Sequence, residues 1–173
     1  MLPANSMSTT VMNKKAFQDY YTVNFSQCYG CGRLNEKGLH IKSYWDGDET
    51  VCTFNPDEKY CGIPGMVYGG LIASLIDCHS TGSASAFAIR AEGRELGSEP
   101  AIRFLTAALH VDFKNPTPMG VPLELRSTAK EIKPKKVIVT TILSANGVEC
   151  ARGEVVAVRV PDAVVDTINS KIK

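Results

Sequence analysis

The hydrophobic pattern changes sharply near the middle of the chain. In residues 39–45 and again in residues 50–54, apolar side chains alternate with polar ones, which is typical of half-buried strands. From residue 70 to about residue 90 the chain has no proline and is small or apolar almost all round. This pattern predicts one long helix that is buried on nearly every side.

The remaining predicted elements are mostly strands. A turn at Asp46-Gly47-Asp48 joins the first two strands, and Asn146-Gly147 is a strong hairpin turn between the last two. Alternating runs after the helix predict four more strands, over residues 106–114, 123–132, 137–144 and 149–160. The predicted order is therefore two strands, one buried helix and a meander of four strands.

A lone helix that is apolar on all sides has to be wrapped by other elements. One curved antiparallel sheet of about six strands can do this, which predicts the α+β class and a single hotdog domain over residues 28–160. Residues 1–27 are expected to be an N-terminal extension with a short helix at 14–21, and residues 161–173 a tail with a short helix. The open edge of such a sheet usually needs covering by a second subunit.

Composition and charge narrow the class of protein. The chain has 173 residues, of which 44% are hydrophobic and 21% charged, as expected for one globular domain. A net charge of +1 provides no basic surface for nucleic acid and no polybasic membrane segment, and no apolar stretch is long enough to span a bilayer. Six cysteines without a secretory signal favour free thiols and a cytoplasmic location.

Candidate chemistry lies on the predicted helix. Its polar positions share one face, at spacings of three and four residues: Ser74, Asp77, Thr81 and Ser85. Gly69 and Gly70 stand where loop becomes helix, so their amides are unpaired and lie at the positive end of the helix dipole. These amides could therefore bind an oxygen that carries negative charge, and Asp77 supplies a carboxylate on the same helix.

The segment 62–77 resembles the active-site segment of hotdog-fold acyl-CoA thioesterases of the phenylacetate-pathway type. Their signature is histidine-glycine-glycine, followed by an aspartate eight residues after the first glycine. Here Tyr68, Gly69, Gly70 and Asp77 occupy these places. The segments 28–39 and 106–120 are similar to the same subgroup, so the resemblance covers most of the chain.

The resemblance implies an acyl-CoA thioesterase with Gly69, Gly70, Tyr68 and Asp77 as its catalytic residues. Thioester hydrolysis needs an oxyanion donor and a carboxylate that attacks or activates water, and the glycine amides and Asp77 would supply these two groups. Whether Asp77 acts as nucleophile or as general base is left open. Tyr68 departs from the usual histidine, and tyrosine is bulkier and titrates near ~10. The substitution leaves room for altered substrate choice, weak activity or loss of activity.

Helix geometry adds an expectation about assembly. Eight residues of helix rise about 12 Å, so Asp77 cannot touch a carbonyl group that is held at Gly69 of the same chain. The carboxylate must then come from a neighbouring subunit, as the resemblance also implies. We expect an obligate homodimer with two shared sites, with a tetramer as the alternative.

Three further residues are predicted to contact the substrate. Thr81, one turn beyond Asp77, would orient the carboxylate or a water molecule, or would bond back to its own helix. Lys114 stands at a strand end, where it could meet the phosphates of coenzyme A, and Val67 directly precedes the signature. The sequence leaves open the acyl chain and the carrier, which is either coenzyme A or an acyl carrier protein.

Neither a metal nor a redox cofactor is expected. Cys28 and Cys31 form a C-x-x-C pair, but a structural zinc site usually takes four ligands from two such pairs. The other cysteines are single in the sequence: Cys52, Cys61, Cys78 and Cys150. Coenzyme A enters only as part of the substrate.

Two other functions remain in view. The first alternative is a hotdog protein that binds acyl thioesters without hydrolysing them, and the replacement of the usual histidine by Tyr68 favours it. A hotdog hydratase or dehydratase ranks lower. Enzymes of that kind carry a catalytic histidine near the helix start, and residues 61–77 contain no histidine. His79 would lie about 200° around the helix from Asp77, so we expect it to be a buried packing residue.

Overall fold

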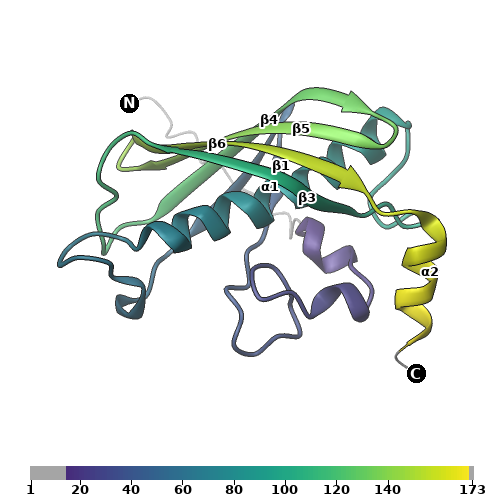
Figure 1. Cartoon of the computed structure of the whole chain (residues 1–173), viewed down its shortest axis with the longest axis horizontal. Coiled ribbons are helices and arrows are strands. Elements are labelled where there is room, and N and C mark those ends of the chain that lie inside the picture. Colours follow the sequence, from purple (N-terminus) through teal and green to yellow (C-terminus); the bar gives the residue numbers. More distant parts are fainter. Residues whose placement is uncertain (1–14, 172–173) are drawn as a thin grey trace, which may run out of the picture.

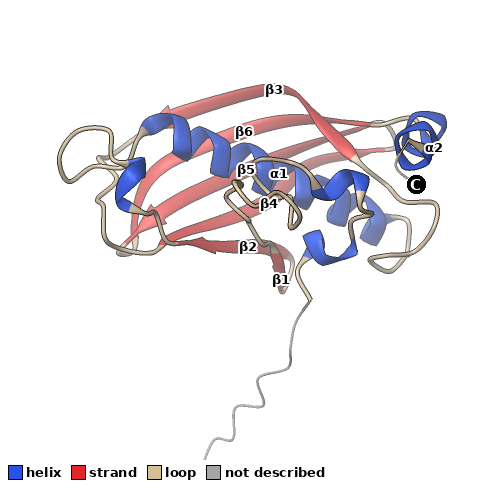
Figure 2. Ribbon diagram, turned by 90° about the horizontal axis from the view of Figure 1, so that it is seen from below, coloured by secondary structure: helices blue, strands red, loops and turns tan. Residues whose placement is uncertain are grey.

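A curved antiparallel sheet wraps around one long helix (Figures 1 and 2). The computed structural model describes residues 15–171. In this range the sheet has six strands in the order β1-β2-β4-β5-β6-β3, and neighbouring strands are antiparallel. Their bounds are β1 Tyr44–Asp46, β2 Glu49–Phe54, β3 Phe104–Phe113, β4 Leu123–Lys133, β5 Lys136–Ala145 and β6 Val148–Arg159. The predicted hotdog architecture is confirmed.

The long helix, α1, runs from Gly69 to Ala91, within one residue of the predicted bounds at each end. It ends where Gly93 takes a φ of +67°, and the Arg94 N–H then returns to the carbonyl of Ile89 at 3.0 Å. This left-handed glycine closes the last turn. On the sheet side of the helix Leu75 and Ile76 are fully buried.

Turns containing glycine join the strands at the predicted places. Gly47 has a φ of +64° between β1 and β2, and Asn146 and Gly147 have φ values of +51° and +76° between β5 and β6. Two successive positive φ values are what a type I′ hairpin turn requires. The predicted tail helix is also present, as α2 (Asp162–Ser170).

The first strand is shorter than predicted. The side chains of residues 39, 41 and 43 are buried in alternation, but β1 begins only at Tyr44. The N–H groups of Leu39 and Ile41 donate to loop carbonyls of Tyr29 and Gly30, at 2.7 and 3.0 Å, so they form no strand ladder. Burial alternates as in a strand because the segment is extended between the loop and the core.

The predicted N-terminal helix is a single 3-10 turn, η1 (Phe17–Tyr20), and Lys14 lies outside the described residues. Two other short 3-10 turns, η2 (Asn24–Ser26) and η3 (Glu58–Tyr60), interrupt the loops. The segment that contains η1 and η2 packs beside α1 on the open side of the sheet (Figure 2). None of the helices in the described range is long and apolar enough to cross a membrane.

Strand β3 forms one edge of the sheet. It pairs with β6 from Phe104 to Phe113, and its outer side has no strand partner among the described residues. Residues 105–110 are exposed, and the apolar side chains of Leu105 and Phe113 are 60% and 58% exposed. A long apolar edge of this kind is suited to pairing with a strand of another chain.

His79 belongs to a buried hydrogen-bond network that ties α1 to the N-terminal segment. Its Nδ1 lies 2.8 Å from Ser43 Oγ, and Ser43 Oγ accepts a hydrogen bond from Gln18 Nε2 at 3.1 Å. The ring is fully buried, as predicted, and burial lowers the pKa of His79 to about 4. The histidine is therefore neutral in the folded protein near pH 7.

We expect His79 to make the protein less stable in mild acid. In the unfolded chain its pKa is near ~6.5, so between there and about pH 4 the unfolded state binds the extra proton. The free energy of unfolding should fall with decreasing pH in this window, by at most ~1.4 kcal/mol per pH unit from this group. Urea denaturation of wild type and His79→Gln across the window measures the effect. The exposed-ring variant His110→Gln is the control, and an equally steep fall in His79→Gln would contradict the expectation.

Candidate active site

Two of the cavities along α1 have predicted site residues in their walls. The first has a volume of about 460 Å³ and lies at the start of the helix, where Val67, Gly69 and Lys114 form part of its wall. The second has a volume of about 400 Å³ and is lined by Asp77 and Thr81. Within one chain Gly69 and Asp77 therefore line different cavities, whereas Tyr68 and Gly70 line neither of the two.

The first turn of α1 offers backbone donors. The N–H groups of Leu71 and Ile72 donate to the Tyr68 carbonyl at 3.0 and 3.3 Å, whereas those of Gly69 and Gly70 have no backbone acceptor in the described range. The first N–H groups of a helix cannot bond within it, and they lie at the positive end of its dipole. These two amides can therefore bind an oxygen that carries negative charge.

Tyr68 lies against the glycine pair. Its ring packs over Gly70 so closely that a Cβ at that position would collide with ring atoms, and the side chain is 57% exposed. Only glycine allows this placement of the ring. The structure thus brings together Tyr68, Gly69, Gly70 and, across the first cavity, Lys114, whose Nζ lies 3.4 Å from Asp112 Oδ2.

Asp77 is held by a residue of the edge strand. Thr106 Oγ1, on β3, donates a short hydrogen bond to Asp77 Oδ1. The Thr81 hydroxyl instead donates to the carbonyls of Asp77 and Cys78 at 3.1 and 3.2 Å, so it is bonded back to its own helix. Sequence reasoning missed Thr106, because only the packing of α1 against β3 brings it to the carboxylate.

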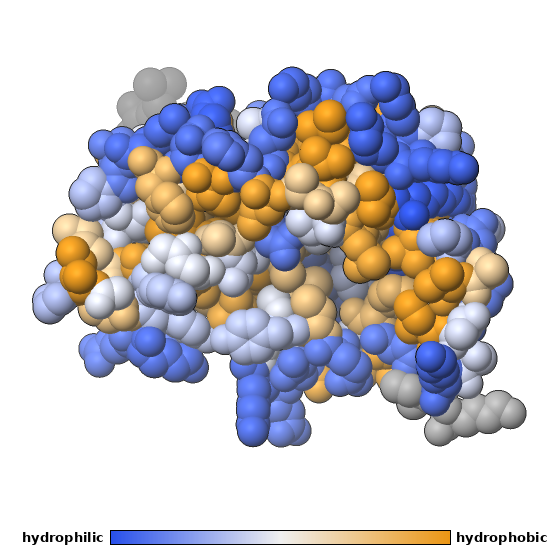
Figure 3. Space-filling model, in the orientation of Figure 1, coloured by the Kyte–Doolittle hydropathy of each residue, from blue (hydrophilic) through white to orange (hydrophobic). Residues whose placement is uncertain are grey.

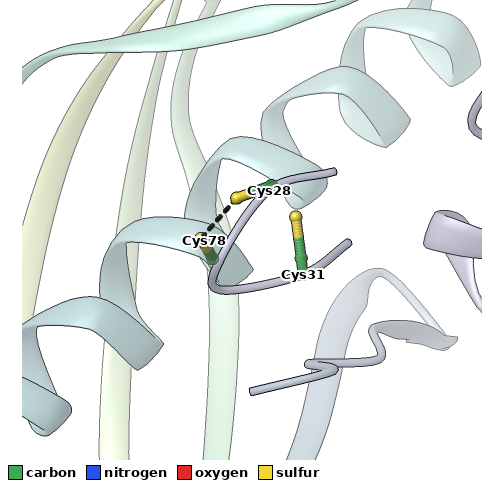
Figure 4. Close-up of side chains that lie close together, drawn as sticks. All are labelled: Cys28, Cys31 and Cys78. Carbon is green, nitrogen blue, oxygen red and sulfur yellow. Dashed lines mark hydrogen bonds between the residues drawn. The ribbon is translucent and has the colours of Figure 1, made fainter. Parts of the chain in front are cut away.

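Three cysteine side chains lie close together beside α1 (Figure 4), and they line the same cavity as Asp77. Cys28 and Cys31 come from the loop before β1 and Cys78 comes from α1, and their three sulfur atoms lie within 4.8 Å of one another. Hydrogen bonds from the Cys31 and Cys78 thiols and from the backbone N–H groups of Cys31 and Gly30 lower the pKa of Cys28 to about 2. The same interaction with Cys28 raises the pKa of Cys31 to about 12 and also raises that of Cys78. Of the three thiols, Cys28 is therefore the one that loses its proton most readily.

A buried arginine lines the cavity with Asp77 and the cysteines. Arg103 is 8% exposed, stacks against the rings of Tyr21 and Phe25 with its Cζ 4.3 and 5.5 Å from the ring centres, and forms no ion pair in the described range. Burial lowers the pKa of Arg103 and raises that of Tyr21. A buried guanidinium without a carboxylate partner is unusual, because burying an unpaired charge is costly.

The surface over these elements is partly apolar. Figure 3 shows hydrophobic residues across the middle of this face of the molecule, with hydrophilic residues gathered at its rims. Two exposed apolar side chains of β3 contribute to the cavity walls: Phe113 lines the first cavity and Leu105 lines the second. The arrangement can bind a ligand that is apolar over much of its length.

One of the similar solved structures shares nearly half of its aligned residues with this chain. A thioesterase superfamily protein from Shewanella loihica is 47% identical, over 83% of this chain and 99% of that chain, with a TM-score of 0.62. A phenylacetic acid degradation-related protein from Ralstonia eutropha is 16% identical, over 69% of this chain and 85% of that chain, with a TM-score of 0.54, and shares the fold alone. No family model matches the chain.

Curated relatives are similar over part of their length. Acyl-coenzyme A thioesterase THEM4 from Xenopus laevis is 33% identical over 87 residues, which are 50% of this chain and 33% of that protein. The match therefore spans only about a third of the relative.

Proposed function

The chain belongs to the thioesterase superfamily, and from this premise we propose that it is an acyl-CoA thioesterase, which releases coenzyme A and a carboxylic acid. One observation carries the proposal: a carboxylate held by Thr106 lies on the same helix as two free N-terminal amides. An oxyanion donor and an activated oxygen nucleophile are the groups that the reaction requires. The motif order favours the phenylacetate-pathway subgroup.

In the proposed reaction the thioester carbonyl oxygen accepts hydrogen bonds from the amides of Gly69 and Gly70. Asp77 either attacks the carbonyl carbon or takes a proton from the water that does so, and both routes are compatible with a carboxylate on a cavity wall. The tetrahedral intermediate then expels the coenzyme A thiolate, which takes up a proton. If Asp77 is the nucleophile, this step leaves an acyl anhydride on Asp77, and water then hydrolyses the anhydride to the carboxylic acid and free Asp77. Tyr68 is proposed to orient the thioester, and no metal or redox cofactor takes part in this reaction.

We propose that the working site combines two subunits. The two chemical groups are eight residues apart on α1, a rise of about 12 Å, and they face different cavities. The exposed edge of β3 supports pairing with a second copy, which would bring its Asp77 to the Gly69 end of this helix. The proposed assembly is a homodimer with two sites; a tetramer would be a pair of such dimers.

The substrate contacts follow from the same arrangement. Val67 and Lys114 line the first cavity, where the exposed ammonium of Lys114 would meet coenzyme A phosphates. Thr81 would contribute the carbon side of its side chain, because its hydroxyl is used by the helix backbone. The same site would accept the pantetheine arm of an acyl carrier protein, and a cytoplasmic location stays a prediction.

Thiol release from short, medium, long and aryl acyl-CoAs tests the proposed activity. Turnover of at least one of them is the expected result, and the preferred chain length then describes the pocket. Absence of turnover together with a rise of the melting temperature on adding an acyl-CoA would instead support the binding protein. Tyr68→His would then be the variant expected to gain activity, because it restores the residue of the signature.

A further inference from the structure

We propose that Cys28, Cys31 and Cys78 bind one zinc ion at the wall of the cavity that holds Asp77. In the sequence, zinc was not expected because the chain has no second C-x-x-C pair to complete the ligand set. The fold instead supplies the third ligand from α1, one residue after Asp77, because the loop that carries Cys28 and Cys31 packs over this turn of the helix (Figure 4).

The spacing of the sulfur atoms fits a zinc ion. Zn–S bonds of about 2.3 Å in a tetrahedral site place two sulfurs about 3.8 Å apart. The Sγ atoms of Cys28 and Cys78 are 3.8 Å apart, and all three sulfurs lie within 4.8 Å of one another. A set of thiolates with this geometry favours a soft, tetrahedral ion over calcium or magnesium, which prefer oxygen ligands.

The loop is shaped to bring its sulfurs onto the helix. Gly30 lies directly against Cys78, where a Cβ would collide with the Cys78 sulfur, and a Cβ at Gly32 would collide with the backbone of Cys28. These two close approaches hold the loop that carries Cys28 and Cys31 against the turn of α1 that carries Cys78.

The surroundings also supply a balancing charge. Zinc with three thiolates carries a net charge of about −1. Arg103 is buried, lines the same cavity and forms no ion pair with another described residue, although its guanidinium donates to the carbonyls of Ile102 and Tyr20 at 2.9 and 3.4 Å. A negatively charged metal site would supply the anionic partner that this buried guanidinium otherwise lacks.

All three cysteines line the cavity, so the fourth position of the ion would face it and take a water molecule. Binding replaces thiol protons with the metal and releases them to solvent. The site would fasten the N-terminal loop to α1 beside Asp77. It would thereby stabilise one wall of the cavity, whatever reaction takes place there.

Metal titration of the reduced, metal-free protein tests the site. We expect one equivalent of Zn²⁺ to bind in competition with a chromophoric chelator and to raise the melting temperature. Co²⁺ should give a thiolate-to-metal absorption band. Cys28→Ser and Cys78→Ser should each weaken zinc binding at least ~10-fold, since even loss of a residue outside the ligand set costs this much.

Cys61→Ser is the matched control, because Cys61 is exposed and lies outside the cluster. Cys28 is exposed as well, so its variant is expected to fold, and a cooperative thermal transition checks this. No zinc uptake by the reduced wild type, or uptake that Cys28→Ser leaves unchanged, would overturn the proposal. Formation of a Cys28–Cys78 disulfide in a protein that takes up no zinc would show that the cluster is a redox pair instead.

Discussion

Asp77→Asn is expected to lower thioester hydrolysis at least ~100-fold, the usual loss when a catalytic acid or base is removed. Asparagine has nearly the same size as aspartate and keeps an oxygen that can accept the hydrogen bond from Thr106. Its amide, however, neither attacks a carbonyl carbon nor takes a proton from water. The measurement is kcat and KM for thiol release with the best substrate of the acyl-CoA panel.

Two further variants show whether the loss of activity comes from the Asp77 carboxylate itself. Asp166→Asn removes an exposed carboxylate of α2 that lines neither cavity, and it should leave kcat nearly unchanged. Thr106→Val removes the donor to Asp77 and should lower kcat less than Asp77→Asn, because the carboxylate remains. Near wild-type kcat for Asp77→Asn would refute its catalytic role and redirect attention to the binding alternative.

Mixing two inactive variants is expected to restore activity. Asp77→Asn lacks the carboxylate, and Gly69→Val places a branched side chain at the amides, where a Cβ alone would be in ordinary contact with Phe113 at 3.5 Å. If each site takes its amides from one subunit and its carboxylate from the other, a mixed dimer has one intact site. Unfolding and refolding an equimolar mixture makes about half of the dimers mixed, so about one quarter of wild-type activity should return.

Each variant refolded alone provides the control and should stay inactive. Sedimentation of the refolded mixture checks that dimers have formed. A mixture with no more activity than its components would contradict a site shared between subunits. A wild-type protein that sediments as a monomer and still hydrolyses thioesters would contradict it directly.

Local patterns predicted most of the fold. The run of small and apolar residues after residue 70 could bury its side chains only as a helix that other elements surround. The observed bounds of α1 match this prediction closely. Asn146-Gly147 predicted a hairpin turn because asparagine and glycine adopt positive φ values at little energetic cost. The prediction was wrong for residues 39–43, because alternating burial does not reveal whether a backbone bonds to a strand or to a loop.

The candidate site was predictable where its parts are close in sequence. The spacing of Gly69, Gly70 and Asp77 along the helix follows from helix geometry alone, and so does the expectation, still a prediction, that two chains share the site. Thr106 carried no signal, because it is an ordinary strand residue until β3 is placed beside α1. The same applies to Cys78, whose meeting with Cys28 requires the N-terminal loop to pack on the helix.

The sequence by itself thus determined the elements, their order and the chemical groups on one helix, since periodicity, turn residues and helix rise are local properties. Only the tertiary structure decided which cavity each group faces, which strand holds Asp77 and which sulfurs lie together. These contacts join residues as much as 50 positions apart along the chain. They depend on the packing of whole elements, which no local pattern encodes.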